Sequence, residues 1–206
     1  MDEVNSFYSP EDLGLMSEAL REPKPWDAKY LEGLKRRIYE HHRKRQHSLC
    51  CYCQRDQYGE FKFVIDIEHI LPKEKFRSHM FELWNLSVSC KRCNMQIKGQ
   101  RVDFLRDASF TSLLKDDPKA YKFIHPNLDP LHLHLIRQSV QSGQRRIVKY
   151  VIAKGSNKGR YTYKYFRLNE LEIDSFDAAQ NPISEDTPSA TLDAFRTLVN
   201  QLRDSK

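Results

Sequence analysis

The sequence predicts an α+β fold, and three observations indicate it. Leu31, Leu34 and Ile38 recur at helical spacing between residues 30 and 45, which predicts an amphipathic helix. Residues 59–70 (GEFKFVIDIEHI) are typical of a turn and a β-hairpin whose second strand ends near a histidine. Two Cys-x-x-Cys pairs enclose this stretch and predict a bound metal ion. We therefore expect a small mixed domain in which strands and a helix are held together by metal.

The composition is that of a globular chain with a basic balance. Among 206 residues, 39% are apolar and 30% are charged, which is enough for one domain with a buried core. Lys and Arg number 34 against 28 Asp and Glu, so the net charge of +6 suits a polyanionic partner without requiring one. The first residues lack the basic and apolar regions of a signal peptide, and no apolar run is long enough to cross a bilayer. We expect a cytoplasmic protein with no membrane partner.

Changes in composition along the chain predict three regions. Residues 1–29 are expected to be a polar leader, punctuated by prolines, with a short helix near residues 11–21. Residues 30–106 contain the amphipathic helix, the strands and the cysteines, and we expect them to be the core. Residues 107–206 are expected to form an accessory region that packs on the core.

The accessory region carries weaker signals. Residues 123–135 (FIHPNLDPLHLHL) are typical of a proline-broken loop followed by a short strand. Residues 145–155 (RRIVKYVIAKG) and 160–168 (RYTYKYFRL) alternate as strands do and predict a β-hairpin. Residues 188–203 predict a terminal helix, and residues 177–189 (DAAQNPISEDTPS) a flexible linker. The core is thus expected to be flanked by an N-terminal helix and by a C-terminal β-hairpin plus helix.

The cysteine spacing is the strongest chemical signal in the chain. Cys50 and Cys53 form one Cys-x-x-Cys pair, and Cys90 and Cys93 form the other. Each pair can chelate one ion from a tight turn, and two pairs complete the tetrahedral sulfur shell that Zn²⁺ prefers. Such a shell has no open position, so the ion is expected to stabilise the fold rather than to catalyse. Cys51 lies inside the first pair and is interpreted as a spare thiol.

Residues 50–99 resemble a known family. Their pattern, CxYC, then EHILPK, then WNLSVSCKRCNMQIKG, resembles the HNH or ββα-metal endonucleases, and in particular the branch with paired zinc knuckles. In that family a strand ending in Asp/Glu-His, a central Asn and a helical His or Asn form the active site. The resemblance covers about a quarter of the chain. It implies a ββα-metal nuclease core that hydrolyses DNA phosphodiester bonds with a catalytic metal.

The resemblance also implies roles for individual residues. His69 would be the general base that takes a proton from the attacking water, because the pKa of an imidazole lies near neutrality. Glu68 and Asn94 would bind the catalytic metal, and Asn85 would orient His69. A carboxylate and an amide oxygen are hard ligands and favour Mg²⁺ or Mn²⁺. The family more often has Asp at the position of Glu68, so Asp66, on the same strand face, stays a competing ligand.

Basic residues surround the motif. Each alone is typical of a solvated surface charge, but together they could hold phosphates on both sides of the scissile bond. The expected contacts are Lys73, Lys91, Arg92, Lys98 and Arg101. No base-reading motif accompanies them, so the choice of target is expected to come from elsewhere, for example from a partner.

Residues 123–135 resemble a segment of the PtuB-type nucleases of the Septu anti-phage system, which work beside an ATPase partner. This resemblance implies an effector of bacterial anti-phage defence. Two alternatives remain open at this point. One is an HNH nuclease directed at RNA or tRNA, and the other is a non-catalytic zinc module that binds nucleic acid or protein.

Overall fold

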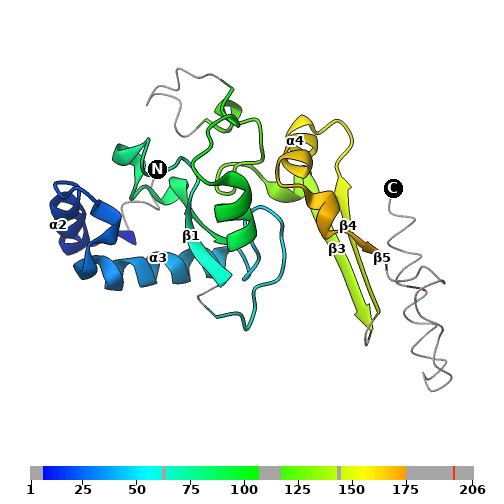
Figure 1. Cartoon of the computed structure of the whole chain (residues 1–206), viewed down its shortest axis with the longest axis horizontal. Coiled ribbons are helices and arrows are strands. Elements are labelled where there is room, and N and C mark those ends of the chain that lie inside the picture. The colour runs from blue at the N-terminus through cyan, green and yellow to red at the C-terminus, as the bar shows by residue number, and fades with distance from the viewer. Residues whose placement is uncertain (1–6, 62–63, 107–116, 143–144, 175–196, 198–206) are drawn as a thin grey trace. The chain divides into compact units, whose positions relative to one another are not determined.

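The computed structural model describes residues 7–61, 64–106, 117–142, 145–174 and 197, which form two compact units. The first unit is Met1–Asp129 and the second is Pro130–Lys206 (Figure 1). Helices and small antiparallel sheets occur together, so the predicted α+β class is confirmed. The division at residue 129 differs from the boundary at residue 106 that the sequence suggested. None of the helices in the described ranges is long and apolar enough to cross a membrane.

The first unit begins with the helix α2 (Pro10–Ala19), whose start is fixed by a capping box. The Ser9 hydroxyl accepts a hydrogen bond from the Asp12 amide at 3.2 Å, and the Asp12 carboxylate accepts one from the Ser9 amide at 2.9 Å. Proline at the first helical position has no amide hydrogen to leave unpaired. The short helix expected in the leader is therefore present.

The helix α3 (Glu32–Arg45) confirms the prediction made from helical spacing. Its buried stripe is Leu34, Ile38 and His42, and the first two join a core that includes Met16 of α2. Basic residues fill its last turn, where positive charge complements the helix dipole. The remaining helical turns of this unit are short: η1 (Pro25–Asp27), η2 (Lys29–Leu31), η4 (Arg77–His79), η5 (Leu83–Asn85) and η8 (Pro118–Ala120).

Two strands and a short helix form the part of the first unit that bears the motif. The strand β1 (Ile65–His69) pairs antiparallel with β2 (Leu86–Cys90), and the π-helix η6 (Arg92–Lys98) follows directly. The predicted hairpin within residues 59–70 is wrong, because the partner of β1 comes from beyond η5. Residues just upstream of this stretch do not pair with β1. Instead, the Gln57 amide donates to the Ser48 carbonyl at 2.8 Å and closes the loop that contains the first cysteine pair.

The second unit is a three-stranded antiparallel sheet with a helix. β3 (Leu135–Ser142) pairs with β4 (Arg145–Ile152), and β5 (Ile173–Asp174) pairs with the other edge of β4. The helix α4 (Asn157–Tyr165) follows, and two short turns complete the unit: η9 (Leu131–Leu133) and η10 (Leu168–Leu171).

The hairpin predicted from residues 145–155 and 160–168 is wrong, because most of residues 160–168 lie in α4. The Ser156 hydroxyl accepts from the Gly159 amide at 2.9 Å and starts the helix. Tyr161 and Tyr165 then stack at helical spacing, with ring centroids 5.6 Å apart. The expected linker and terminal helix lie outside the described residues, apart from residue 197.

Candidate functional site

The four paired cysteines meet in the interior of the first unit. Cys50, Cys53, Cys90 and Cys93 are all buried, and their sulfur atoms lie within 4.8 Å of one another. The sulfur atoms of Cys53 and Cys90 are 3.8 Å apart. A tetrahedral ion with Zn–S bonds of about 2.3 Å places its sulfur ligands about 3.8 Å apart. The cysteines are therefore positioned to bind a structural Zn²⁺, as the sequence predicted.

Local backbone contacts bring the two pairs together. Cys50 and Cys53 lie in a tight turn that closes when the Gln54 amide donates to the Cys50 carbonyl at 2.9 Å. Cys90 is the last residue of β2, and its amide donates to the Cys50 sulfur at 3.4 Å. Burial, together with the neighbouring Cys50, raises the pKa of the Cys51 thiol well above its usual range. A thiol that stays protonated is a poor nucleophile, which agrees with the interpretation of Cys51 as a spare residue.

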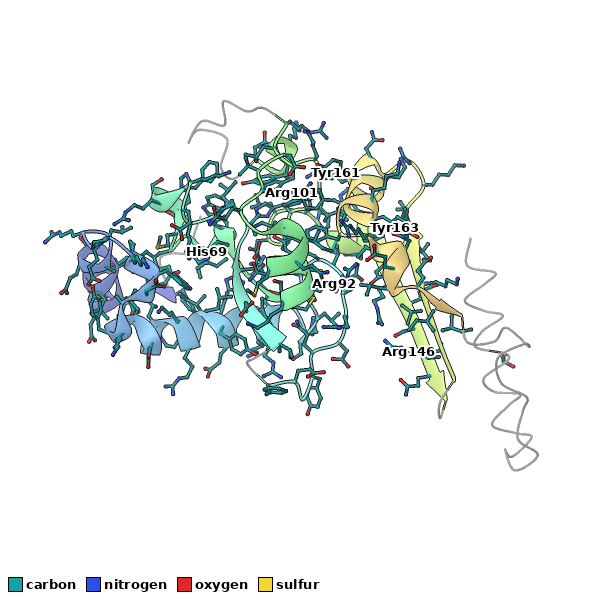
Figure 2. The ribbon with its side chains drawn as sticks, viewed as in Figure 1. His69, Arg92, Arg101, Arg146, Tyr161 and Tyr163 are labelled. Atoms are coloured by element: carbon teal, nitrogen blue, oxygen red, sulfur yellow. The ribbon has the colours of Figure 1, made fainter. Side chains whose placement is uncertain are left out.

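His69 ends β1 and is 7% exposed (Figure 2). The Trp26 ring packs edge-on against its imidazole, with centroids 4.4 Å apart. Burial lowers the pKa of His69 to about 3, with smaller contributions from Lys73 and Lys98, while a hydrogen bond to the Met80 backbone opposes the shift. The Nε2 atom has no hydrogen-bond partner within the described part of the chain. His69 is thus a neutral imidazole at pH 7, and its Nε2 could accept a proton only after it is uncovered.

Glu68 is tied into a buried polar cluster. Its side chain is 1% exposed, and Oε1 accepts hydrogen bonds from Lys98 Nζ at 2.6 Å and from the Tyr52 hydroxyl at 3.0 Å. Lys98 Nζ also donates to the His69 carbonyl at 2.8 Å. Burial raises the pKa of Glu68, and the Lys98 ammonium opposes this. Glu68 and Lys98, expected from the sequence to meet metal and phosphate, here neutralise each other below the surface.

The oxygen donors that lie nearer to solvent are Asp66, two residues before Glu68 on β1, and Asn94. Asn94, in η6, donates from Nδ2 to Asp66 Oδ2 at 3.3 Å, and Lys91 Nζ lies 3.4 Å from Asp66 Oδ1. The Asp66 side chain is 27% exposed. Both Asp66 and Asn94 line a cavity of about 840 Å³. Asp66 is therefore the acid of β1 that is open to a metal ion in this conformation, and the sequence had kept it as a competing ligand.

Asn85 is fully buried and ties the loop after β1 to its surroundings. Its Oδ1 accepts from the Leu71 amide at 2.7 Å, while Nδ2 donates to the carbonyls of Leu71 at 3.2 Å and His79 at 2.9 Å. The Asn85 carbonyl accepts from the Ile70 amide at 2.9 Å. This geometry holds the backbone directly after His69, as a positioning residue would.

The predicted phosphate contacts differ in their exposure. Arg92 is the first residue of η6 and Arg101 follows its end (Figure 2), and Arg101 pairs with Asp103 at 2.5 Å. Lys73 pairs with Glu74 at 2.5 Å. With Lys91, these side chains are partly or fully exposed, whereas Lys98 is buried. Trp26 was missed at the sequence level, because no local pattern signals that its ring reaches the end of β1.

Residues 123–129 contribute structure to the candidate site. His125 is fully buried, and its Nδ1 accepts from the Asn127 amide at 3.2 Å. The Asn127 side chain donates to the carbonyls of Trp84 at 2.8 Å and Leu86 at 2.7 Å. The segment therefore fixes the start of β2.

Comparison with known proteins found one curated relative. Septu protein PtuB of Bacillus thuringiensis is 27% identical to this chain over 123 residues. The chain is a distant homologue of PtuB. The predicted resemblance to PtuB-type proteins is thus confirmed. The match covers 60% of this chain but only 37% of PtuB, so it spans little more than a third of that relative's length. No family model and no solved structure matches the chain.

Proposed function

We propose that this chain is a metal-dependent HNH-type endonuclease that hydrolyses DNA phosphodiester bonds. The observation that carries the proposal is the placement of His69, whose buried Nε2 has no hydrogen-bond partner among the described residues, at the end of a strand whose acids face η6. Two antiparallel strands, a short helix that follows them and the four-cysteine cluster support the proposal, because the HNH fold implied by the sequence resemblance contains these elements in this order.

Asp66 and Asn94 would hold the catalytic metal through a carboxylate and an amide oxygen. Both are hard donors at the surface of the cavity, so they fit Mg²⁺ or Mn²⁺ with retained water. Glu68 can join them only if its ion pair with Lys98 opens. When bound, the metal would neutralise charge on the phosphate and on the leaving oxygen.

His69 would accept the proton of the attacking water on Nε2. The hydrogen bond to the Met80 backbone fixes the orientation of the ring, and Asn85 fixes the loop that follows. Because the Trp26 ring covers His69, substrate binding must displace that contact or approach beside it. Removal of the burial would raise the pKa of His69 toward its ordinary value and make it a stronger base.

The homology to PtuB supports a role in anti-phage defence. PtuB-type nucleases resemble this chain and work with an ATPase, so we propose an ATPase partner that restrains or directs cleavage. The partly or fully exposed basic residues Lys73, Lys91, Arg92 and Arg101 would supply affinity for the phosphate backbone without sequence preference. We propose that the ATPase partner selects the nucleic acid that is cut.

The test is an incubation of the purified chain, alone and with its ATPase partner, with plasmid DNA and with total RNA. Cleavage of plasmid with Mg²⁺ or Mn²⁺, its loss in EDTA and its loss in His69→Ala are the expected results. Cleavage of RNA alone would favour the RNA-directed alternative. If neither nucleic acid is cut and His69→Ala behaves as wild type in every binding assay, the chain is a non-catalytic zinc module.

Two single substitutions test the proposed metal ligands Asp66 and Asn94. Asp66→Asn is expected to raise the Mn²⁺ concentration needed for half-maximal cleavage, because it removes the exposed carboxylate. Asn94→Ala is expected to do the same while leaving DNA affinity nearly intact. An unchanged metal requirement in both variants would contradict their assignment as ligands.

A further inference from the structure

A cavity of about 840 Å³ opens beside the candidate metal ligands, and the roles proposed so far use only one of its walls. That wall is formed by β1 and η6, and it includes Asp66 and Asn94. The opposite wall is formed by α3 together with Trp26 of η1. The volume of the cavity lies within the range of small-molecule binding sites, so the cavity can hold a group as large as a nucleotide.

The α3 wall presents one continuous face of that helix. Lys35, Arg36 and Tyr39 line the cavity at helical spacing, next to the stripe that α3 buries in the core. Tyr39 and Lys35 are half-buried, and Arg36 is exposed. The Lys35 ammonium lies 5.5 Å from the centroid of the Trp26 ring. Two cations and two aromatic rings therefore converge on the same space.

Charge alone does not explain this arrangement. Glu32 and Asp66 also line the cavity, so two carboxylates oppose the two cations and an isolated anion gains little. A nucleotide fits better, because its base offers a flat apolar face to Trp26 and Tyr39 while its phosphates can lie against Lys35 and Arg36. Aromatic faces combined with cations are the usual means by which proteins bind single-stranded nucleic acid.

We propose that this cavity, which we call the α3 groove, binds the nucleotide next to the scissile phosphate in an unpaired segment of nucleic acid. The inference rests on the proposed function, because it takes Asp66 and Asn94 as the place where the phosphate is cut. The groove is continuous with that pair, so a strand cut there runs along α3. A duplex keeps its base faces stacked inside, so only an unpaired segment can place a base face against Trp26 or Tyr39.

The first experiment measures binding of a fluorescent single-stranded polythymidine oligonucleotide to the zinc-loaded chain in buffer without Mg²⁺ or Mn²⁺, where no cleavage is expected. Tyr39→Ala and Trp26→Ala are expected to weaken binding by about tenfold, the usual effect of losing one base-stacking ring. The matched control is Tyr58→Ala, because Tyr58 is 83% exposed and does not line the groove. We expect Tyr58→Ala to bind the oligonucleotide as tightly as the wild type does.

A second pair of variants tests the groove without removing any contact. Gly33 lines the cavity, and a Cβ atom added there meets no other atom within 4 Å. Gly33→Ala should therefore fold and bind as the wild type does. Gly33→Glu adds bulk and negative charge inside the groove and is expected to weaken binding of the oligonucleotide by about tenfold or more.

The salt dependence tests the cationic wall. Replacing both Lys35 and Arg36 with Gln should reduce the slope of log affinity against log salt by about 0.7 for each lost phosphate contact. An unchanged slope would place the phosphates elsewhere and overturn that part of the inference.

The inference fails if Gly33→Glu and Tyr39→Ala bind the oligonucleotide as tightly as wild type, or if both weaken a blunt duplex of the same length equally. Failure of the proposed nuclease activity is seen separately. It would appear as no metal-dependent cleavage of any nucleic acid, with oligonucleotide binding in the absence of Mg²⁺ and Mn²⁺ still sensitive to Tyr39→Ala and Gly33→Glu.

Discussion

Replacement of Lys98 distinguishes a buried ion pair from a surface phosphate contact. Lys98→Met removes the ammonium that lies 2.6 Å from Glu68 Oε1 and leaves the carboxylate with the Tyr52 hydroxyl. Both members of the pair have side chains that are 1% exposed. Removing one partner of a buried pair usually costs about 3–5 kcal/mol, because the other charge stays buried and unpaired. A solvated surface lysine would cost within about 0.5 kcal/mol.

The measurement is urea unfolding of the zinc-loaded chain, followed by tryptophan fluorescence. Trp26 and Trp84 are the two tryptophans of the chain, and both lie in the first unit, so the signal reports the unit that contains the pair. The control is Lys91→Met, because Lys91 pairs with Asp66 at 3.4 Å with 43% of its side chain exposed. Exposed pairs of this kind contribute about 0–1 kcal/mol.

The single variant Glu68→Gln and the double variant Glu68→Gln with Lys98→Met complete the cycle. The double variant removes both charges, so we expect it to recover most of the stability that Lys98→Met loses. A free energy of unfolding for Lys98→Met within 0.5 kcal/mol of wild type would refute the buried pair. If that variant instead lowered the salt dependence of DNA binding, Lys98 would be the phosphate contact that the sequence suggested.

Three further predictions concern other buried residues of the first unit. Cys93→Ser should unfold the first unit, because loss of the structural ion removes folding free energy, and a zinc-free variant with a wild-type circular dichroism spectrum would contradict this. Asn85→Ala should lower the free energy of unfolding by about 2–3 kcal/mol, through three lost hydrogen bonds, and should slow cleavage without changing the affinity for the oligonucleotide. Burial lowers the pKa of His42 to about 3, so the unfolded chain binds more protons in acid and stability is lost as pH falls from about 6.5 toward 3. Between pH 7 and pH 5 His42 contributes about 2 kcal/mol to this loss, so His42→Leu should reduce the total loss in urea titrations by about that amount, while the similar contribution of His69, whose pKa is also about 3, stays.

The sequence correctly predicted the features that depend on residues close together in the chain. The spacing of Leu34 and Ile38 predicted α3, and the two Cys-x-x-Cys turns predicted the cluster. Both depend on residues a few positions apart. The identity of β1 was also correct, but its partner was not, because β2 is brought to it by the loop that Asn85 ties down.

The errors arose where distant contacts override a local pattern. Alternating tyrosines at 161, 163 and 165 predicted a strand, yet the Ser156 cap and the close approach of Gly159 to the His134 carbonyl favour a helix. A Cβ atom at Gly159 would lie 2.3 Å from that carbonyl, so the packing requires glycine. Likewise, the position of Lys98 one turn after Asn94 gave no sign that its ammonium points inward to Glu68.

The direct succession of Cys93 and Asn94 couples maturation of the fold to the proposed chemistry. The last sulfur ligand and the amide that would hold the catalytic metal are neighbours in the same short helix. Because a structural ion contributes folding free energy, loss of zinc would also release Asn94 from its place beside Asp66. Under the proposed function, zinc would therefore have to bind before the second metal site can form.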